Sequence, residues 1–179
     1  MTHEGRQLNT GAVPIIETDR LILRAPQMSD LPRMTAFFAT SRSHMVGGPR
    51  DEPETFRTLT SRLGHWMLRG YGMWHFHTKA DERFMGWAGL MYAPGWHEPE
   101  LGWTVMEDGE GKGLASEAVT AARAYAARHQ ALDALMSYIA PANARSRAMA
   151  IRLGATFERK AELLGMSCDI YRHPRQEAA

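Results

Sequence analysis

Apolar residues recur along the chain with two different spacings, and the shorter spacing predicts strands. Short runs in which apolar residues alternate with polar ones, or follow one another between turn residues, are typical of β-strands. Such runs occupy residues 17–24, 73–78, 84–92, 99–106, 133–140, 155–161 and 166–172. The links between the second, third and fourth of these runs are too short for a crossover helix, so we expect those three strands to form an antiparallel meander.

The longer spacing, with apolar residues three and four positions apart, predicts helices. Four helices are expected, at residues 30–40, 53–69, 113–129 and 144–153. The first two should each bury one apolar face. These faces consist of Leu31, Met34, Phe37 and Phe38 in the first helix and of Phe56, Leu59, Leu63 and Trp66 in the second.

The order of the predicted elements is β-α-α-β-β-β-α-β-α-β-β. Strand 133–140 follows a helix that itself follows strand 99–106, so these two strands should run parallel to each other. The short links elsewhere favour antiparallel pairing. The sequence therefore predicts an α/β (α+β) domain with a mixed, mostly antiparallel central sheet and helices on both faces.

Composition limits the class of protein. A chain of 179 residues with 44% hydrophobic and 23% charged residues is typical of one globular domain. We assign this domain to residues 14–174 and expect residues 1–13 and 175–179 to be poorly ordered tails. The net charge of +1 provides no field for nucleic acid or an anionic membrane. A lone cysteine, Cys168, and the absence of a long apolar run in the sequence favour a cytoplasmic protein.

A glycine-rich turn connects strand 99–106 to the alanine-rich helix. Gly109, Gly111 and Gly113 lie in this turn, where the missing side chains let a ligand contact the backbone. The first N–H groups of the following helix have no partner within the helix, and the helix dipole favours negative charge at that end. The arrangement suits a phosphate or a pyrophosphate.

Two common nucleotide motifs do not fit this turn. The Walker motif requires Ser or Thr after Gly-Lys, but Gly111-Lys112 is followed by Gly113, and its early glycine position holds Met106. The dinucleotide motif requires Gly or Ala where the chain has Ser116, and no strand with an acidic ribose ligand follows at the right distance. A plain glycine-rich connection between strand and helix remains the alternative to a phosphate site.

Three sequence blocks resemble a known family. The turn Glu110-Gly-Lys-Gly-Leu-Ala115 resembles the acetyl-CoA pyrophosphate loop, Arg/Gln-x-x-Gly-x-Gly/Ala, of the GNAT N-acetyltransferases. Asn143-Ala-Arg-Ser146, followed by Arg152-Leu-Gly-Ala-Thr-Phe157, resembles a downstream block of the same family. Glu17-Thr-Asp-Arg-Leu-Ile-Leu-Arg24 resembles the first strand in its RimJ/RimL branch of ribosomal-protein N-terminal acetyltransferases. The chain departs from the pattern at Glu110, from which we expect no contact with a pyrophosphate.

The resemblance implies acetyl-CoA as the cosubstrate and a sheet that is splayed between strands 99–106 and 133–140. Backbone N–H groups of the glycine turn would hold the pyrophosphate, the exposed edge of strand 99–106 would pair with the pantetheine, and the downstream block would add side-chain contacts. The implied contact residues are Trp103, Thr104, Val105, Gly111, Lys112, Gly113, Leu114, Ala115, Ser116, Asn143 and Ser146. Lys112 is equally well explained as a solvated side chain.

Two side chains are candidates for proton transfer. Glu100 is the first residue of a segment that resembles the Glu-x-Gly-Tyr/Trp motif of the family's RimJ/RimL branch. It is the candidate base for an amine. The usual tyrosine acid is replaced by Ala150, so Ser146 is the candidate partner of the cofactor sulfur, with Tyr138 and Tyr171 as alternatives. An exposed strand carboxylate and a locally bonded hydroxyl are the simpler explanations of Glu100 and Ser146.

Taken together, these features predict direct acetyl transfer from acetyl-CoA to a primary amine, either a protein N-terminus or a small molecule. A non-catalytic acyl-CoA-binding or regulatory module on the same fold is the alternative. His75 and His77 share a strand face, but no third ligand at a suitable spacing supports a metal site. The family resemblance makes a homodimer possible. Four tryptophans are expected in the core or an acceptor pocket: Trp66, Trp74, Trp87 and Trp96.

Overall fold

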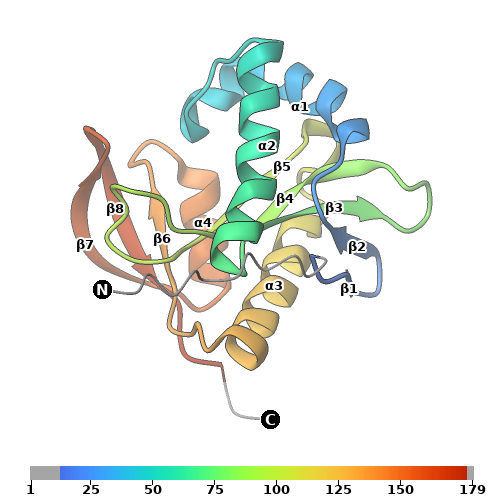
Figure 1. Ribbon diagram of the computed structural model, residues 1–179. Coiled ribbons are helices and arrows are strands. Elements are labelled where there is room, and N and C mark those ends of the chain that lie inside the picture. The colour runs from blue at the N-terminus through green and yellow to red at the C-terminus, as the bar shows by residue number, and fades with distance from the viewer. Residues whose placement is uncertain (1–12, 177–179) are drawn as a thin grey trace, which may run out of the picture.

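The computed structural model describes residues 13–176, and these form one eight-stranded sheet with helices packed on it (Figure 1). The sheet order is β1-β2-β3-β4-β5-β6-β8-β7. The strands are β1 (Ile16–Glu17), β2 (Leu21–Arg24), β3 (Met73–Thr78), β4 (Phe84–Met91), β5 (Glu100–Val105), β6 (Met136–Ile139), β7 (Thr156–Leu163) and β8 (Met166–Arg172). The helices are α1 (Leu31–Phe38), α2 (Glu52–Arg69), α3 (Leu114–Gln130) and α4 (Ala144–Arg152).

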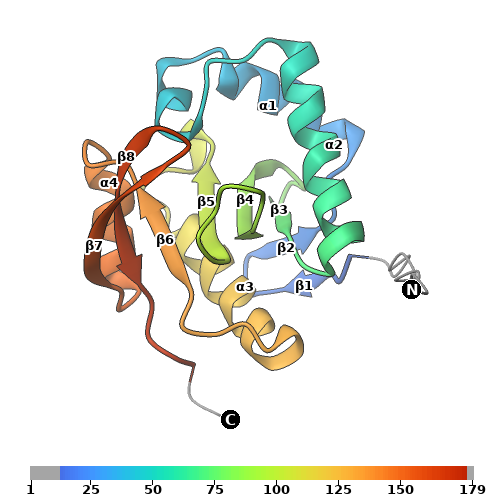
Figure 2. The same cartoon turned by 60° about the vertical axis from the view of Figure 1, so that its left-hand side comes forward.

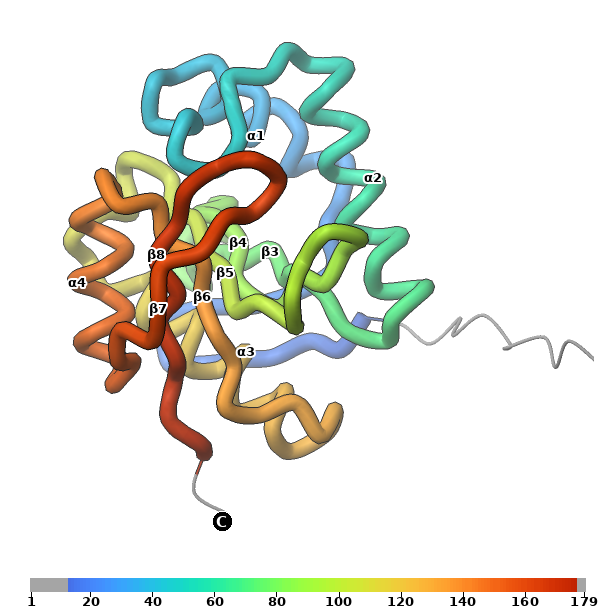
Figure 3. The backbone as a smooth tube through the Cα atoms, turned by 90° about the vertical axis from the view of Figure 1, so that its left-hand side faces the viewer, coloured from blue at the N-terminus to red at the C-terminus, as the bar shows by residue number. Residues whose placement is uncertain are grey.

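Within the described residues there are also three short 3₁₀ helices: η1 (Met28–Asp30), η2 (Ser41–Val46) and η3 (Glu107–Gly109). All neighbouring strands pair antiparallel except β5 and β6, which are parallel. This confirms the predicted mixed, mostly antiparallel sheet. The C-terminal elements α4, β7 and β8 lie together at one end of the sheet (Figures 1 and 3).

Helices cover both faces of the sheet, as predicted (Figure 2). Alternate residues of a strand point to opposite faces, and two neighbouring pairs in β3 and β4 show the consequence. Met73 and Trp87 pack with the apolar residues of α1, whereas Trp74 and Ala88 pack with those of α3. Trp66, Trp74 and Trp87 are core residues with 4% exposure or less.

The first predicted strand is divided in two. Residues 17–24 form the antiparallel hairpin of β1 and β2 instead of one strand. The Thr18 side chain accepts a hydrogen bond from the Leu21 N–H (3.0 Å), which closes the turn between them. The tails predicted at 1–13 and 175–179 fall largely outside the described residues. Within the described residues, Val13 is buried and the Gln176 N–H donates to Asp133 (3.0 Å).

The predicted buried face of α2 is correct for Leu59 and Trp66, which are both 4% exposed, and wrong for Phe56 and Leu63. Phe56 and Leu63 are about two-fifths exposed, and the helix buries Arg62 and His65 instead. Both polar side chains find partners that compensate for lost water. The Arg62 guanidinium lies 3.8 Å from the ring centroid of Trp87. His65 bonds the main chain at both ring nitrogens, to the Tyr71 carbonyl (2.7 Å) and the Tyr92 N–H (3.0 Å).

The histidine pair on β3 belongs to a buried polar network. Asp30 is 1% exposed and contacts His75 Nδ1 (2.7 Å), His77 Nε2 (3.1 Å) and Arg24 Nη2 (2.7 Å). Burial alone would raise the pKa of Asp30, but these hydrogen bonds hold it well below its usual range. Burial lowers the pKa of His75 to about 4, so this imidazole is neutral and donates to the carboxylate. The network joins α1 to β2 and β3.

Removing the charge of Asp30 should therefore destabilise the fold. We expect Asp30→Asn to lower the free energy of unfolding by about 3 kcal/mol, because Arg24 loses its buried counter-charge and a histidine loses its acceptor. Urea denaturation measures this change. The control is Asp19→Asn, which alters an exposed carboxylate and should change stability by less than about 0.5 kcal/mol. Equal effects of the two substitutions would show that the network does not stabilise the protein.

Candidate active site

The sheet opens between its two parallel strands. β5 and β6 pair where Glu100 faces Met136, and beyond this position the strands separate. The splay predicted between strands 99–106 and 133–140 is therefore present, although β6 is shorter than expected. Its first predicted residues form a turn, in which the Ala134 N–H donates to the Asp133 carboxylate (2.7 Å) and Ala134 has a φ of 50°.

A buried serine and histidine tie the two strands together beside this opening. The Ser137 hydroxyl donates to the Leu101 carbonyl (2.5 Å) and accepts from His173 Nε2 (3.0 Å). His173 Nδ1 faces the Arg123 guanidinium at 3.3 Å, so Nδ1 is the acceptor and the proton is on Nε2. Burial and the positive charge of Arg123 lower the pKa of His173 to about 4, which keeps the ring neutral. The side chains thus fix where the separation begins.

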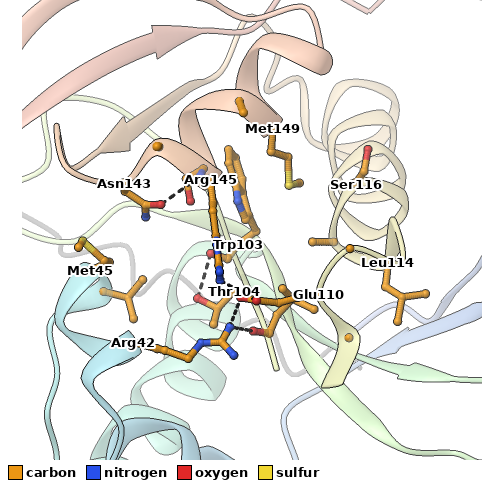
Figure 4. Close-up of a pocket in the computed structure, with 18 of the residues that line it drawn as sticks. Arg42, Met45, Trp103, Thr104, Glu110, Leu114, Ser116, Asn143, Arg145 and Met149 are labelled. Atoms are coloured by element: carbon orange, nitrogen blue, oxygen red, sulfur yellow. Dashed lines mark hydrogen bonds and ion pairs between the residues drawn. The ribbon is translucent and has the colours of Figure 1, made fainter. Parts of the chain in front are cut away.

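A cleft of about 1220 Å³ begins where the strands part. Its walls come from β5, the glycine turn, the first turn of α3, one side of α4, η2 and the end of α1 (Figure 4). Ten of the eleven implied cofactor-contact residues line it. They are Trp103, Thr104, Val105, Gly111, Gly113, Leu114, Ala115, Ser116, Asn143 and Ser146.

Lys112 is the exception, because only its neighbours in the turn line the cleft. Its carbonyl accepts a hydrogen bond from Arg20 Nη1 (2.8 Å), and the Arg20 Nε in turn pairs with Glu117 (2.6 Å). Glu117 also accepts from the Thr18 hydroxyl (2.6 Å). The β1–β2 turn therefore anchors the outer side of the glycine turn to α3, a contact that the sequence pattern did not reveal.

The glycine turn meets the requirements of an anion site. Gly111 and Gly113 have φ values of 71° and 75°, a region that favours glycine. Gly113 precedes α3, and its carbonyl accepts from the Glu117 N–H (3.1 Å), the first i→i−4 bond of the helix. The N–H groups of residues 114–116 thus belong to the turn that lacks intrahelical partners. They lie where the helix dipole favours negative charge.

The start of α4 forms the opposite wall. Asn143 caps this helix, since its Oδ1 accepts from the Ser146 N–H (3.1 Å). The cap leaves the Asn143 amide nitrogen as a donor on the cleft side of α4. Ala150, at the position of the usual tyrosine, is fully buried in an apolar cluster with Tyr171. Packing against Tyr171 explains why a small residue stands at position 150.

Glu100 lies at the closed end of the split, outside the cleft lining. Its side chain is half-buried, and Oε2 accepts from the Trp96 indole N–H (2.8 Å). Burial raises the pKa of Glu100 to about 7, against the opposing hydrogen bonds of Trp96 and the Tyr138 main chain. The carboxylate is therefore not a simple exposed strand residue. Gly102 lies on the same face, where the Met73 side chain packs against it: a Cβ at Gly102 would lie 2.9 Å from Met73 Cε and 3.7 Å from Glu100 Oε1.

The cleft also contains charged residues that the sequence blocks did not identify. Glu110 lines it and pairs with Arg42 of η2 and with Arg145 of α4. No local pattern singles out Arg42, which reaches Glu110 across 68 positions of sequence. Phe37, Met45 and Val46 add an apolar part of the wall from the same N-terminal segment.

Comparisons with known proteins agree with this geometry. The family model described as the acetyltransferase (GNAT) domain matches residues 20–156. The chain belongs to the GNAT acetyltransferase family. An acetyltransferase structure from Agrobacterium tumefaciens is 34% identical, with a TM-score of 0.85 over 96% of this chain and 100% of that one.

Two further similar proteins carry names that refer to ribosomal proteins. The [Ribosomal protein uS5]-alanine N-acetyltransferase of Escherichia coli is 28% identical over 148 residues, which is 78% of this chain and 76% of the relative. RimL, an alpha-N-protein acetyltransferase solved in complex with coenzyme A, has the same fold, with a TM-score of 0.72 and 20% identity over 89% of this chain and 96% of that one.

Within residues 13–176 no helix has the length and apolar character needed to cross a membrane. The same residues contain no group of three or more histidine, cysteine or acidic side chains that could hold a metal ion. His75 and His77 instead contact Asp30.

The Ser137 tie can be tested by its contribution to stability. We expect Ser137→Ala to lower the free energy of unfolding by about 2 kcal/mol, because the Leu101 carbonyl and His173 Nε2 would lose their buried partner. Ser137→Thr keeps the hydroxyl and should recover part of this loss. Ser167→Ala on the exposed side of β8 is the control in the same urea denaturation assay. A Ser137→Ala protein as stable as this control would show that the tie is dispensable.

Proposed function

We propose that this acetyltransferase carries the acetyl group of acetyl-CoA to the N-terminal amine of a protein. One observation carries the proposal: the cleft joins the N-terminal turn of α3 to the split between β5 and β6. An anion site and an exposed strand edge are thus placed in one continuous space. The name of the 28% identical relative, a protein-alanine N-acetyltransferase, supports a protein acceptor.

The residues that line the cleft fit coenzyme A, whose acetyl thioester would supply the group to be transferred. The N–H groups of Gly113, Leu114, Ala115 and Ser116 would bind the pyrophosphate at the start of α3. Because β5 and β6 have parted, the main chain of residues 103–105 is available to pair with an extended pantetheine. The Asn143 amide nitrogen would donate to the same ligand from α4.

Glu100 would act as the base. A carboxyl group with a pKa of about 7 exists in both protonation states near neutral pH, which suits it to accept a proton from an amine. An N-terminal amine has a pKa of about 8, so a modest base is sufficient to deprotonate it. Glu100 would act directly or through one water, since its carboxylate lies at the closed end of the split. This arrangement supports catalysis over a non-catalytic acyl-CoA-binding module.

Ser146 would face the sulfur of the cofactor. It lines the cleft in the first turn of α4, next to the capping residue Asn143. Tyr138 of β6 points to the face of the sheet opposite its neighbour Ile139, which packs with α4, and its hydroxyl accepts from the His97 N–H (3.0 Å). Tyr171 is buried against α4. The hydroxyl of Ser146 is therefore the hydrogen-bond donor to the cofactor sulfur that we favour.

Association into a homodimer stays a prediction. β7 is the last strand at one end of the sheet, which is the position where a second copy would be added. Its residues Thr156–Lys160 are exposed. Such an edge can pair with another chain.

The cofactor site can be tested by placing a negative charge in it. We expect acetyl-CoA to bind the wild-type protein and to bind Ser116→Glu at least about tenfold more weakly, because the new carboxylate would repel phosphate. An acidic residue in the first helical turn favours helix formation, so stability should be maintained. Isothermal titration calorimetry measures both affinities.

Thr120→Glu is the matched control, since it adds the same charge one turn further along α3 at an exposed position outside the cleft. It should bind acetyl-CoA as the wild type does. No binding to the wild type, or equal binding to Ser116→Glu, would refute the assigned phosphate site. If the wild type binds acetyl-CoA, a comparison of its turnover on peptides with free N-termini and on small amines would identify the acceptor class.

The pH profile tests the role of Glu100. The active form is the carboxylate, so we expect kcat/KM to rise with pH up to about 7, with a slope of about one log unit per pH unit. Glu100→Gln should remove this limb and lower kcat/KM by about 10²-fold. Without this base the acceptor amine must already be deprotonated when it binds, so kcat/KM of Glu100→Gln should rise instead up to about pH 8. An unchanged limb near pH 7 in Glu100→Gln would assign it to another group.

A further inference from the structure

An acidic side chain of the glycine turn bridges the two walls of the cleft. Glu110 stands between η3 and Gly111, at the position where the family pattern has Arg or Gln. Its Oε1 pairs with Arg42 Nη2, and its Oε2 accepts from Arg145 Nη1 at 2.6 Å. Arg42 comes from η2 and Arg145 from α4, so one carboxylate holds cations from opposite sides (Figure 4). We call these three residues the arginine clasp.

The charge of the cleft is balanced within this clasp. Among the described residues that line the cleft, Glu110 is the one acidic side chain, whereas Arg42, Arg145 and Arg152 are basic. The ion pairs with Glu110 neutralise part of the positive charge of Arg42 and Arg145 beside the turn that would bind a pyrophosphate. Less positive charge is then available to attract a ligand. An anionic ligand and Glu110 thus compete for the same guanidinium groups.

Arg42 and Arg145 can exchange their ion pairs with Glu110 for contacts with an anionic ligand. The Arg145 side chain is 79% exposed, and ion pairs at this level of exposure are weak. Arg42 is more buried, and its Nη2 also donates to the Val105 carbonyl (3.3 Å). Its Nη1 is buried and has no hydrogen-bond partner among the described residues. Arg42 therefore has donor capacity that the clasp does not use.

We propose that Glu110 is an internal anion that occupies Arg42 and Arg145 in the free protein, and that the phosphates of coenzyme A displace it from both arginines. This rests on the proposed function, because it takes coenzyme A as the ligand. A phosphate is a better partner than Glu110, since it carries more charge and offers several oxygens to the planar guanidinium. Arg42 and Arg145 thereby supply, from outside the glycine turn, the cation that the turn lacks at position 110.

The proposal gives opposite signs for the two kinds of substitution. Arg42→Ala and Arg145→Ala should each weaken coenzyme A binding, with Kd raised about tenfold. Glu110→Gln should tighten binding about threefold, because the free protein no longer holds ion pairs that must break. Glu107→Gln and Arg147→Ala are matched controls, since they change the same charges in the same turn and helix outside the cleft lining. Both should bind as the wild type does.

The double variant Glu110→Gln/Arg145→Ala separates displacement from simple repulsion. If Glu110 acts through its pairs with the arginines, Glu110→Gln should tighten binding less when Arg145 is absent, because only one pair remains to be broken. If Glu110 only repels the phosphates, the gain should be equal in both backgrounds. Calorimetry with coenzyme A on the five single variants, the double variant and the wild type measures all of these terms.

Three results would overturn the proposal while the wild type still binds coenzyme A. These are weaker binding by Glu110→Gln, unchanged binding by both arginine variants, and equal gains from Glu110→Gln with and without Arg145. The first would mean that Glu110 organises the arginines instead of competing for them. A different outcome is that the wild type does not bind coenzyme A at all, and this would refute the proposed function.

Discussion

The separation of β5 from β6 is the constraint on which the rest of this structure depends. Parallel neighbours in a sheet normally satisfy each other's backbone groups, and two strands that part leave those groups exposed. The protein confines the opening to one place. Glu100 pairs with Met136, and the side chain of Ser137 bonds the Leu101 carbonyl beside that pair. Beyond this point, the edge of β5 is free to contact a ligand.

The same separation determines where the charges lie. α3 must carry the chain from β5 to β6, and its first turn therefore starts directly above the opening, where its dipole attracts an anion. Arg20 holds the outer side of the glycine turn through the Lys112 carbonyl. Positive side chains then come from elements on either side of the opening, Arg42 from η2 and Arg145 from α4. The anion site is thus a property of several segments rather than of the glycine turn alone.

The order of elements, the parallel β5–β6 pair and the glycine turn could be predicted because each depends on residues close together in the sequence. Long-range partners could not. Helical spacing predicted that Phe56 and Leu63 of α2 are buried, but Arg62 is buried instead. Its guanidinium contacts Trp87 and His75 of the sheet, which lie far from it in the sequence. In the sequence, Glu110 is only a departure from the family pattern. Its ion pairs with Arg42 and Arg145 become visible only in the folded structure.

Glu100 shows why position along the split matters as much as residue type. A carboxylate at the open end of the cleft would be close to bound phosphate, exposed to water, and held at an ordinary pKa. At the closed end, burial raises its pKa to about 7 while Trp96 keeps one oxygen oriented. The proposed sites of anion binding and proton transfer, which require opposite electrostatic environments, therefore lie apart along one strand, and their separation follows from the way β5 leaves the sheet.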